Sequence, residues 1–390
     1  MKNFEFYSPT KIYFGVGREL ETGQILKQLS VKKVLVVIGQ NSVIKSGLLE
    51  RVTKSVQESE IEYVVLSGVR ANPTFDLVKR GVELIKGNGI DFILPIGGGS
   101  VIDTAKCISV NVDYDGDIKD FNLHIAKPTK AMPIGVVLTI SAAGSELSNS
   151  CVIQDDETGM KAGFNSDLFR PVFAIENPEL TYSVSKEQTA YGIVDILMHS
   201  LERYFNESGE YELADEFALG LIKNVVDVGL LCYNNPTDYN YRARIMLASS
   251  LSHNGTTSIG KSSMLFAHQL EHPLSGMFPN IAHGCGLAVV WPAWATYYLP
   301  YESEKLARLG RRVFALNIKD DMECAKETIN LFKVYFKKLD MPSSLRELGV
   351  KESDIEELVD RVTRKGKRVV SHHKIDMDEQ VVREIYKSCY

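Results

Sequence analysis

The sequence of 390 residues lacks long apolar runs, since no stretch reaches the roughly 18 apolar residues that a membrane-spanning helix needs. Its N-terminal stretch, "MKNFEFYSPTKIYFGVG", has no apolar signal core, and its alternation of polar and aromatic residues predicts a strand over residues 4–14. A formal net charge of -6 argues against a general binder of nucleic acid or another polyanion. We therefore expect neither a membrane nor a nucleic acid among its partners.

Cysteine is also scarce, and the six cysteines are scattered without a Cys-x-x-Cys pair. This spacing argues against both a disulfide framework and a zinc site built from cysteines. Free thiols are typical of a reducing compartment, so we expect a cytoplasmic protein.

The first part of the chain alternates apolar, β-rich runs with amphipathic helical segments. Nearly continuous apolarity marks strands that are buried on both faces, as in a parallel sheet. The expected strands are residues 32–39, 61–68, 91–98, 131–139 and 171–178, and the helices between them are 43–58, 74–88 and 100–111. This order predicts an open, doubly wound α/β domain over residues 1–182.

The β-rich runs stop after about residue 182, and helical spacing takes over. The expected helices are residues 185–206, 210–232, 239–260, 261–274, 303–315, 322–338 and 353–364. We therefore predict an all-helical domain over residues 183–390, with the boundary marked by the turn at Asn177-Pro178.

A glycine-rich loop, "GGGS", joins the strand 91–98 to the helix that follows it. Gly97, Gly98 and Gly99 permit close approach of a ligand, and Ser100 is expected to cap the helix, whose N-terminus favours an anion. A pyrophosphate suits this place at the end of a central strand. The loop matches neither Gly-x-Gly-x-x-Gly nor a Walker loop, so a plain tight turn is the alternative.

Five of the eight histidines fall between residues 199 and 283. Asp195, His199, His268 and His283 together would supply one oxygen and three nitrogens, a donor set for a divalent metal such as Fe²⁺ or Zn²⁺. The alternative for Asp195 and His199 alone, one helical turn apart, is an ordinary side-chain contact. We expect structural roles for the histidines that fit no such group, namely His124, His253 and the exposed-looking pair His372-His373.

Four stretches together resemble the iron-containing (group III) alcohol dehydrogenases, and most of all their butanol-dehydrogenase and aldehyde-reductase branch. They are "GGGSVIDTAK", "LTISAAGSELSNSCVIQDDETGMK", "QTAYGIVDILMHSLERYF" and "AHQLEHPLSGMFPNIAHGCGLAVVWPAW", in the family's order. The resemblance implies a dehydroquinate synthase-like fold: a Rossmann-like dinucleotide-binding domain followed by a helical metal-binding domain. It also implies homodimers.

Residue by residue, the resemblance places the family's metal ligands at Asp195, His199, His268 and His283, and an active-site histidine, thought to relay protons, at His272. The spacing of fifteen from His268 to His283 is one more than the family pattern, which places an extra residue in "SGMFPN". The implied cofactor residues are Asn72, Gly97, Gly98, Gly99, Ser100, Asp103, Thr139, Ser141 and Lys161.

The expected reaction is hydride transfer between a nicotinamide cofactor and a small primary alcohol or aldehyde, with Fe²⁺ or else Zn²⁺ polarising the substrate oxygen. NADP(H) is favoured over NAD(H), because the strand 32–39 ends at Gly39 without an acidic residue to repel a 2′-phosphate. Asn41 and Ser42 could donate hydrogen bonds to that phosphate.

Three other functions remain open on the sequence. A glycerol-type polyol dehydrogenase would share the fold, but the presence of His199 argues against it. A lyase like dehydroquinate synthase would need a more basic pocket than the sequence provides. A non-catalytic protein that binds a metal or a nucleotide would not require His272 beside a cofactor loop.

Overall fold

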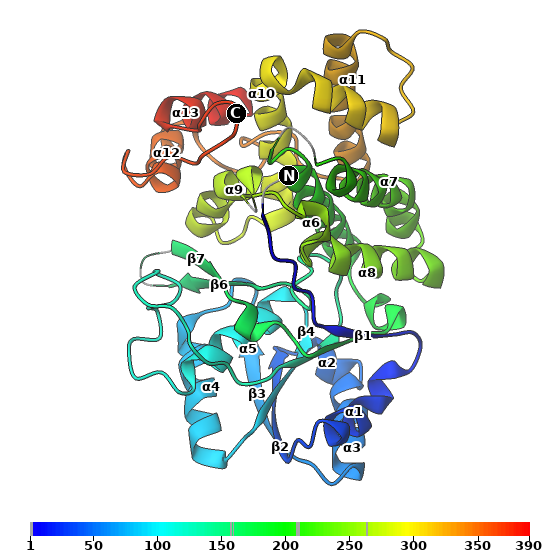
Figure 1. The fold of residues 1–390 in the computed structure, drawn as a ribbon, viewed down its shortest axis with the longest axis vertical. Helices are drawn as coiled ribbons and strands as arrows, with labels where there is room; N and C mark the ends of the chain where they lie inside the picture. The colour runs from blue at the N-terminus through cyan, green and yellow to red at the C-terminus, as the bar shows by residue number, and fades with distance from the viewer. Residues whose placement is uncertain (1–2, 157, 159, 208–210, 263) are drawn as a thin grey trace. The chain divides into compact units, whose positions relative to one another are not determined.

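The computed structural model describes residues 3–390 apart from 157, 159, 208–210 and 263. The chain divides into two compact units (Figure 1). One is Tyr7–Ser183, and the other is Val184–Tyr390 together with the extreme N-terminus as far as Phe6.

The first unit contains a six-stranded parallel sheet with the order β1-β8-β5-β4-β2-β3. Its strands are β1 (Lys11–Phe14), β2 (Lys33–Gly39), β3 (Glu62–Val69), β4 (Phe92–Gly97), β5 (Gly135–Leu138) and β8 (Phe173–Glu176). The five strands expected between residues 32 and 178 are thereby confirmed. The strand expected over residues 4–14 is confirmed only at its end, as β1.

Helices cover both faces of this sheet, which explains the continuous apolarity of its central strands β2 and β4. They are α1 (Thr22–Gln28), α2 (Ser42–Lys45), α3 (Leu48–Glu58), α4 (Phe75–Asn88) and α5 (Gly99–Asn111). Side chains of α1 and α3 pack on Val34, Val36 and Leu94. Helix α5 packs on β4 and α4 (Figure 1).

A separate antiparallel hairpin, β6 (Ser150–Asp155) and β7 (Met160–Asn165), follows β5 and was not expected from the sequence. It is joined to the segment after β3, because the Gln154 N–H donates to the Pro73 carbonyl at 2.8 Å. Short 3₁₀ segments complete this unit at Arg18–Glu21, Asp167–Phe169 and Pro178–Thr181.

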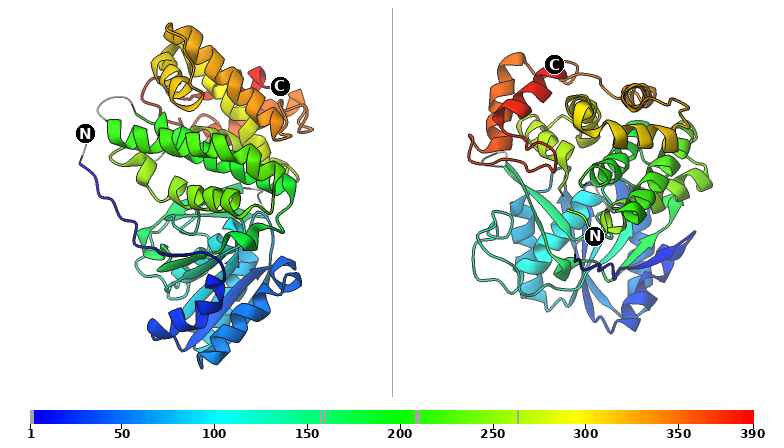
Figure 2. Two further views of the ribbon diagram at one scale, coloured as in Figure 1. Left: turned by 90° about the vertical axis from the view of Figure 1, so that its right-hand side faces the viewer. Right: turned by 45° about the horizontal axis from the view of Figure 1, so that its top comes forward.

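The second unit is helical. Its helices are α6 (Lys186–Tyr204), α7 (Glu212–Asn234), α8 (Tyr239–His253), α9 (Phe266–Met277), α10 (His283–Val313), α11 (Asp321–Lys338), α12 (Ile355–Thr363) and α13 (Glu379–Ser388). Short 3₁₀ segments lie at Thr256–Ser258 and Glu352–Asp354. Figure 2 shows two further views, in which α10 and α11 lie side by side. Among the described residues, no helix is both long and apolar enough to cross a membrane.

Several helical expectations need correction, and one helix was missed. The helix expected at 239–260 ends at His253. The helix expected at 261–274 begins only at Phe266, and the helix expected at 303–315 is the end of the much longer α10. Helix α10 contains Pro300 and is non-helical at Glu302, directly before the expected start at residue 303. Helix α13 was missed.

Candidate active site

Helix α6 presents three ionisable side chains on one face. Asp195, His199 and Glu202 follow the i, i+4, i+7 spacing that places residues on one side of a helix, and all three are buried. The helix starts at the side chain of Ser185, which accepts the Gln188 N–H at 3.1 Å. Buried ionisable side chains are destabilising unless polar or charged groups contact them, and other helices supply those groups.

Helices α6, α9 and α10 bring the four expected ligands together. Ligand atoms of Asp195, His199 and His268 all lie within 4.8 Å of one another. Asp195 Oδ1 is 3.4 Å from His268 Nε2 and 3.8 Å from His283 Nε2. The Nδ1 of His199 lies 3.0 Å from the Asp195 carbonyl, a hydrogen bond that leaves its Nε2 for a ligand.

This donor set fits a divalent cation. Among the described residues, Asp195 Oδ1 and His268 Nε2 are buried atoms without a hydrogen-bond partner. Burying an unpaired carboxylate oxygen beside an unpaired imidazole nitrogen costs folding free energy unless a bound cation interacts with both atoms. Three nitrogens and one oxygen are ligands that both Fe²⁺ and Zn²⁺ accept.

The electrostatics of the cluster also favour a positive charge bound among these side chains. Burial lowers the pKa of His268, but the carboxylates of Glu202 and Asp195 outweigh it and raise that pKa to about 10. Burial and the neighbouring imidazoles of His253 and His268 hold the pKa of His199 well below its usual range. His199 is therefore neutral, the state in which imidazole binds a metal.

Two glutamates beside the ligands were missed by sequence reasoning. Glu202 Oε1 lies 2.5 Å from His268 Nδ1, and Glu271 Oε2 contacts His283 Nδ1. Both glutamates are buried. Their spacing was a usable signal, because Glu202 follows the ligand His199 by three residues and Glu271 follows His268 by three.

His283 is the first residue of α10, so it lies on a helix although two glycines follow it closely. The neighbouring glycines serve close helix packing instead. A Cβ on Gly284 would come within 2.6 Å of the Tyr191 backbone, and one on Gly286 within 2.7 Å of Glu271 Cγ. The two glycines thus let α10 approach α6 and α9 closely enough to bring in His283.

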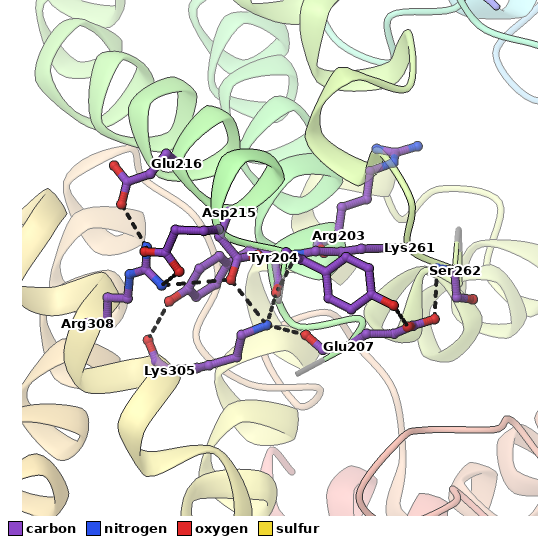
Figure 3. Close-up of polar contacts among 11 residues, drawn as sticks. Arg203, Tyr204, Glu207, Asp215, Glu216, Lys261, Ser262, Lys305 and Arg308 are labelled. Atoms are coloured by element: carbon purple, nitrogen blue, oxygen red, sulfur yellow. Dashed lines mark hydrogen bonds and ion pairs between the residues drawn. The ribbon is translucent and has the colours of Figure 1, made fainter. Parts of the chain in front are cut away.

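The C-terminal end of α6 is held by a buried network of charges (Figure 3). The Nζ of Lys305 donates to the carbonyl of Tyr204 at 2.6 Å, and Lys261 forms an ion pair with Asp215. The Arg203 side chain donates to the carbonyl of His199 at 2.9 Å. Cations at the exposed carbonyls of a helix end stabilise it, which fixes the helix that carries two of the ligands.

His272, the expected proton-relay residue, lies on α9 and is half-buried. Its ring centroid is 5.8 Å from that of His283 and 6.1 Å from that of His268. The side chain is therefore next to two of the expected ligands.

The pair His372-His373 departs from expectation. His372 is only 6% exposed, so the prediction of an exposed pair is wrong for it. The two rings lie near the buried Glu302, with His373 Nε2 at 2.8 Å from Glu302 Oε1. However, His372 Nδ1 accepts the Lys374 N–H at 3.2 Å, so neutral His372 carries its proton on Nε2. That nitrogen then has no lone pair for a metal.

In the first unit, the expected cofactor residues gather at the carboxyl ends of the parallel strands, where open α/β sheets bind ligands. Gly39 ends β2, Asn72 follows β3 and is half-buried, and Gly97 ends β4. Strands β2 and β4 are neighbours although β3 separates them in the chain. The glycine loop therefore flanks the point where the strand order reverses. Asn41 and Ser42 are exposed at the start of α2.

The glycine loop is packed against the segment after β5. The Thr139 N–H donates to the Gly97 carbonyl at 3.1 Å. A Cβ on Gly98 would come within 2.1 Å of Ile140 Cγ2, so a larger residue would force Ile140 to move. The expectation that Ser100 caps α5 is wrong, because the N-cap is Gly98 and no side chain bonds there. Thr139, Ser141 and Ser100 are half-buried.

Asp103 and Lys106 of α5 form hydrogen bonds with the loop of residues 145–150. Asp103 accepts from Ser145 Oγ at 2.6 Å and from the Val152 N–H at 3.0 Å. Burial raises the pKa of Asp103, while Lys106 and then Lys161 act in the opposite direction. Lys161, on β7, is half-buried.

The fully buried Lys106 has five oxygen partners. Its Nζ donates to the carbonyl and hydroxyl of Ser145, the carbonyl and hydroxyl of Ser148, and the carbonyl of Ser150, at 2.7–3.1 Å. The pair Asp103 and Lys106 thus holds residues 145–150, which follow Thr139 and Ser141.

Comparison with known proteins identifies the class to which this fold and metal-ligand cluster belong. The family model described as "Iron-containing alcohol dehydrogenase" matches residues 9–178. The model described as "Fe-containing alcohol dehydrogenase family, C-terminal" matches residues 189–390. The chain belongs to the iron-containing alcohol dehydrogenase family and is an oxidoreductase that acts on alcohols.

Three relatives illustrate the likeness. The chain is 37% identical to NADH-dependent butanol dehydrogenase A of Clostridium acetobutylicum over 100% of both chains. It is 30% identical to the NADPH-dependent aldehyde reductase YqhD of Escherichia coli, again over 100% of both. The crystal structure of NADH-dependent butanol dehydrogenase A from Thermotoga maritima superposes with a TM-score of 0.95 at 34% identity, covering 100% of this chain and 99% of that one.

Proposed function

We propose that this protein interconverts a small primary alcohol and its aldehyde by hydride transfer with a nicotinamide cofactor, at a divalent iron held by Asp195, His199, His268 and His283. The observation that carries the proposal is the convergence of these side chains around unpaired buried atoms, Asp195 Oδ1 and His268 Nε2. Family membership and the butanol dehydrogenases and aldehyde reductase among the relatives support the reaction. Zn²⁺ is the alternative metal, since the same donors accept it.

The bound ion supplies Lewis-acid polarisation of the substrate oxygen. The protein's own contribution is position and charge. Asp195 offers a carboxylate oxygen, and His199, His268 and His283 offer ring nitrogens, all held in place by helices. His272 is proposed as the group that passes a proton between the substrate oxygen and solvent, because it is half-buried and adjacent to the ligands.

The cofactor is proposed to bind the first unit with its pyrophosphate at Gly97, Gly98, Gly99 and Ser100. The close packing of Gly98 on Ile140 supports this, because it leaves no room for a side chain unless Ile140 moves. A loop without side chains at a strand end lets backbone N–H groups approach a phosphate. Asn72, Thr139, Ser141 and Lys161 are proposed for the ribose and nicotinamide. Asp103 is proposed as a further cofactor-site residue, because its hydrogen bond with Ser145 helps to hold the loop of residues 145–150.

We further propose a preference for NADP(H) over NAD(H). No acidic side chain stands at Gly39 to Ser42, and the exposed Asn41 and Ser42 can donate to a 2′-phosphate. The named relatives include users of both cofactors, so the ratio of kcat/KM for NADPH and NADH decides the point. A higher value for NADH contradicts the preference.

Two further assignments are proposed. The six cysteines are all free thiols, which supports a reducing, cytoplasmic location. The outer edge strand β1 is a candidate for pairing across a homodimer.

The test is reduction of C2–C6 aldehydes by NADPH or NADH with and without added Fe²⁺ or Zn²⁺. We expect metal-dependent turnover, and His268→Ala and Asp195→Ala should lose both metal and activity. Full activity in either variant contradicts the site. A protein that binds metal and cofactor but oxidises neither NADPH nor NADH with any aldehyde would be the non-catalytic binding protein instead.

A further inference from the structure

Two buried glutamates stand behind the proposed ligands, on the side of each imidazole that faces away from Asp195. We infer that Glu202 and Glu271 are positioning residues that hold His268 and His283 in the tautomer with Nε2 open to the metal, and so set the metal affinity of the site. This inference rests on the proposed metal site.

Glu202 joins two helices and one ligand. Its Oε1 lies 2.5 Å from His268 Nδ1, while Oε2 accepts the N–H groups of Ala267 at 2.5 Å and His268 at 3.3 Å. These N–H groups belong to the first turn of α9, which has no side-chain cap of its own. One carboxylate from α6 therefore caps α9 and orients the first imidazole on it.

Glu271 acts on the second imidazole. Its Oε2 contacts His283 Nδ1 from the next turn of α9, and its side chain is fully buried. The space for it is made by Gly286, because any Cβ there would meet Glu271 Cγ. The His283 side chain itself is 29% exposed, so its orientation depends on this contact more than on packing.

The arrangement needs carboxylates rather than any hydrogen-bonding group. An ionised carboxylate only accepts, so a neutral imidazole, the form that binds a metal, must present Nδ1–H to it, which leaves a lone pair on Nε2. For His268 that Nε2 is the unpartnered buried atom facing Asp195 at 3.4 Å. Carboxylates placed behind metal-ligating histidines typically contribute 10–100-fold to metal affinity.

An amide in the same place reverses the tautomer. In Glu202→Gln, the amide oxygen can still accept the Ala267 N–H, and the amide NH₂ then faces His268 Nδ1. Nδ1 becomes the acceptor, the ring proton moves to Nε2, and the ligand becomes a donor. The cap on α9 survives, so the change separates metal binding from folding.

Glu302 offers a matched control within the same unit. It is also a buried glutamate with a histidine partner, since its Oε1 lies 2.8 Å from His373 Nε2. It belongs to a separate cluster, which includes His372. Glu302→Gln therefore repeats the chemical change away from the proposed ligands.

The experiment measures Co²⁺ affinity of metal-free, full-length protein by competition with a chromophoric chelator, together with thermal unfolding of the metal-free protein. We expect Glu202→Gln and Glu271→Gln each to lose about 10–100-fold in affinity with unfolding temperatures near that of the parent. The visible spectrum of the bound Co²⁺ should also change, because one imidazole leaves its coordination. Glu302→Gln should keep the parent affinity and spectrum.

The outcomes separate the inference from the function on which it rests. If the parent protein binds no Co²⁺, the proposed metal site is wrong. If the parent binds Co²⁺ and both glutamine variants bind it equally well, or Glu302→Gln loses as much, the positioning role is wrong. If Glu202→Gln is too unstable to measure, Glu271→Gln alone decides, since Glu271 contacts the imidazole of His283 and does not cap α9.

Discussion

Lys106 offers a test of how burial and hydrogen bonding hold the loop proposed to carry the cofactor. Its ammonium is fully buried among five oxygens, and burial lowers its pKa from 10.5 to about 8. The folded-state pKa thus lies below that of the unfolded chain. Between these two values the unfolded state binds more protons, so the stability contributed by Lys106 rises with pH across this window.

The magnitude follows from the two pKa values. Integrated from about pH 7 to about pH 9.5, the linkage gives a gain of about 2 kcal/mol. Lys106→Met lacks the titrating amine. The free energy of unfolding of the parent minus that of the variant should therefore grow by about 2 kcal/mol over the same pH interval. Titrations of groups that do not interact with Lys106 cancel in the difference. The exposed Lys54, exchanged for methionine, is the control and should give a flat difference.

The assay is urea unfolding followed by far-UV circular dichroism at both pH values. The two tryptophans, Trp291 and Trp294, lie in the helical unit, so their fluorescence reports that unit and identifies its transition separately. A parent-minus-variant difference that stays flat or shrinks with pH would refute the reasoning about Lys106.

Three further outcomes follow from the site. His272→Ala should retain the metal but lower kcat by about 10²–10⁴-fold, and loss of metal in elemental analysis would show that His272 is a ligand instead. Gly98→Ala should weaken NADPH binding at least tenfold with the metal retained, because its Cβ would lie within 2.1 Å of Ile140 Cγ2, and an unchanged affinity in a fluorescence titration would contradict this. Gly286→Ala should lower metal affinity, since the new Cβ displaces Glu271, and Gly87→Ala, with open space at its Cβ, is its control.

The sequence alone predicts most of the architecture because apolar periodicity is a local signal. The central strands β2 and β4 of the parallel sheet are short, continuous apolar runs because they are buried on both faces. The hairpin β6–β7 escaped notice because its residues mix polar and apolar types without clear alternation. Helix α13 was missed although Val381, Val382, Ile385 and Tyr386 carry a helical pattern that packs it into the core.

Those parts of the site were predictable in which residue type and local spacing alone determine the metal-binding geometry. Asp195 and His199 lie one turn apart on one helix, and that geometry is fixed by local sequence. The contacts of Glu202 and Glu271 join segments far apart in the chain or on different helices, and no local pattern states which imidazole they meet. The buried position of His372 depends likewise on tertiary packing against Phe266 and Tyr298.

The central claim, a metal-dependent hydride transfer at the cluster around Asp195, is tested most directly by titrating metal-free protein with Fe²⁺ under anaerobic conditions. The rate of butanal reduction by NADPH is followed against the amount of ion bound. We predict a rate that rises in proportion to bound Fe²⁺ and saturates near one ion per chain, and no response in Asp195→Ala. A rate that is independent of the ion, or an undiminished response in Asp195→Ala, would contradict it.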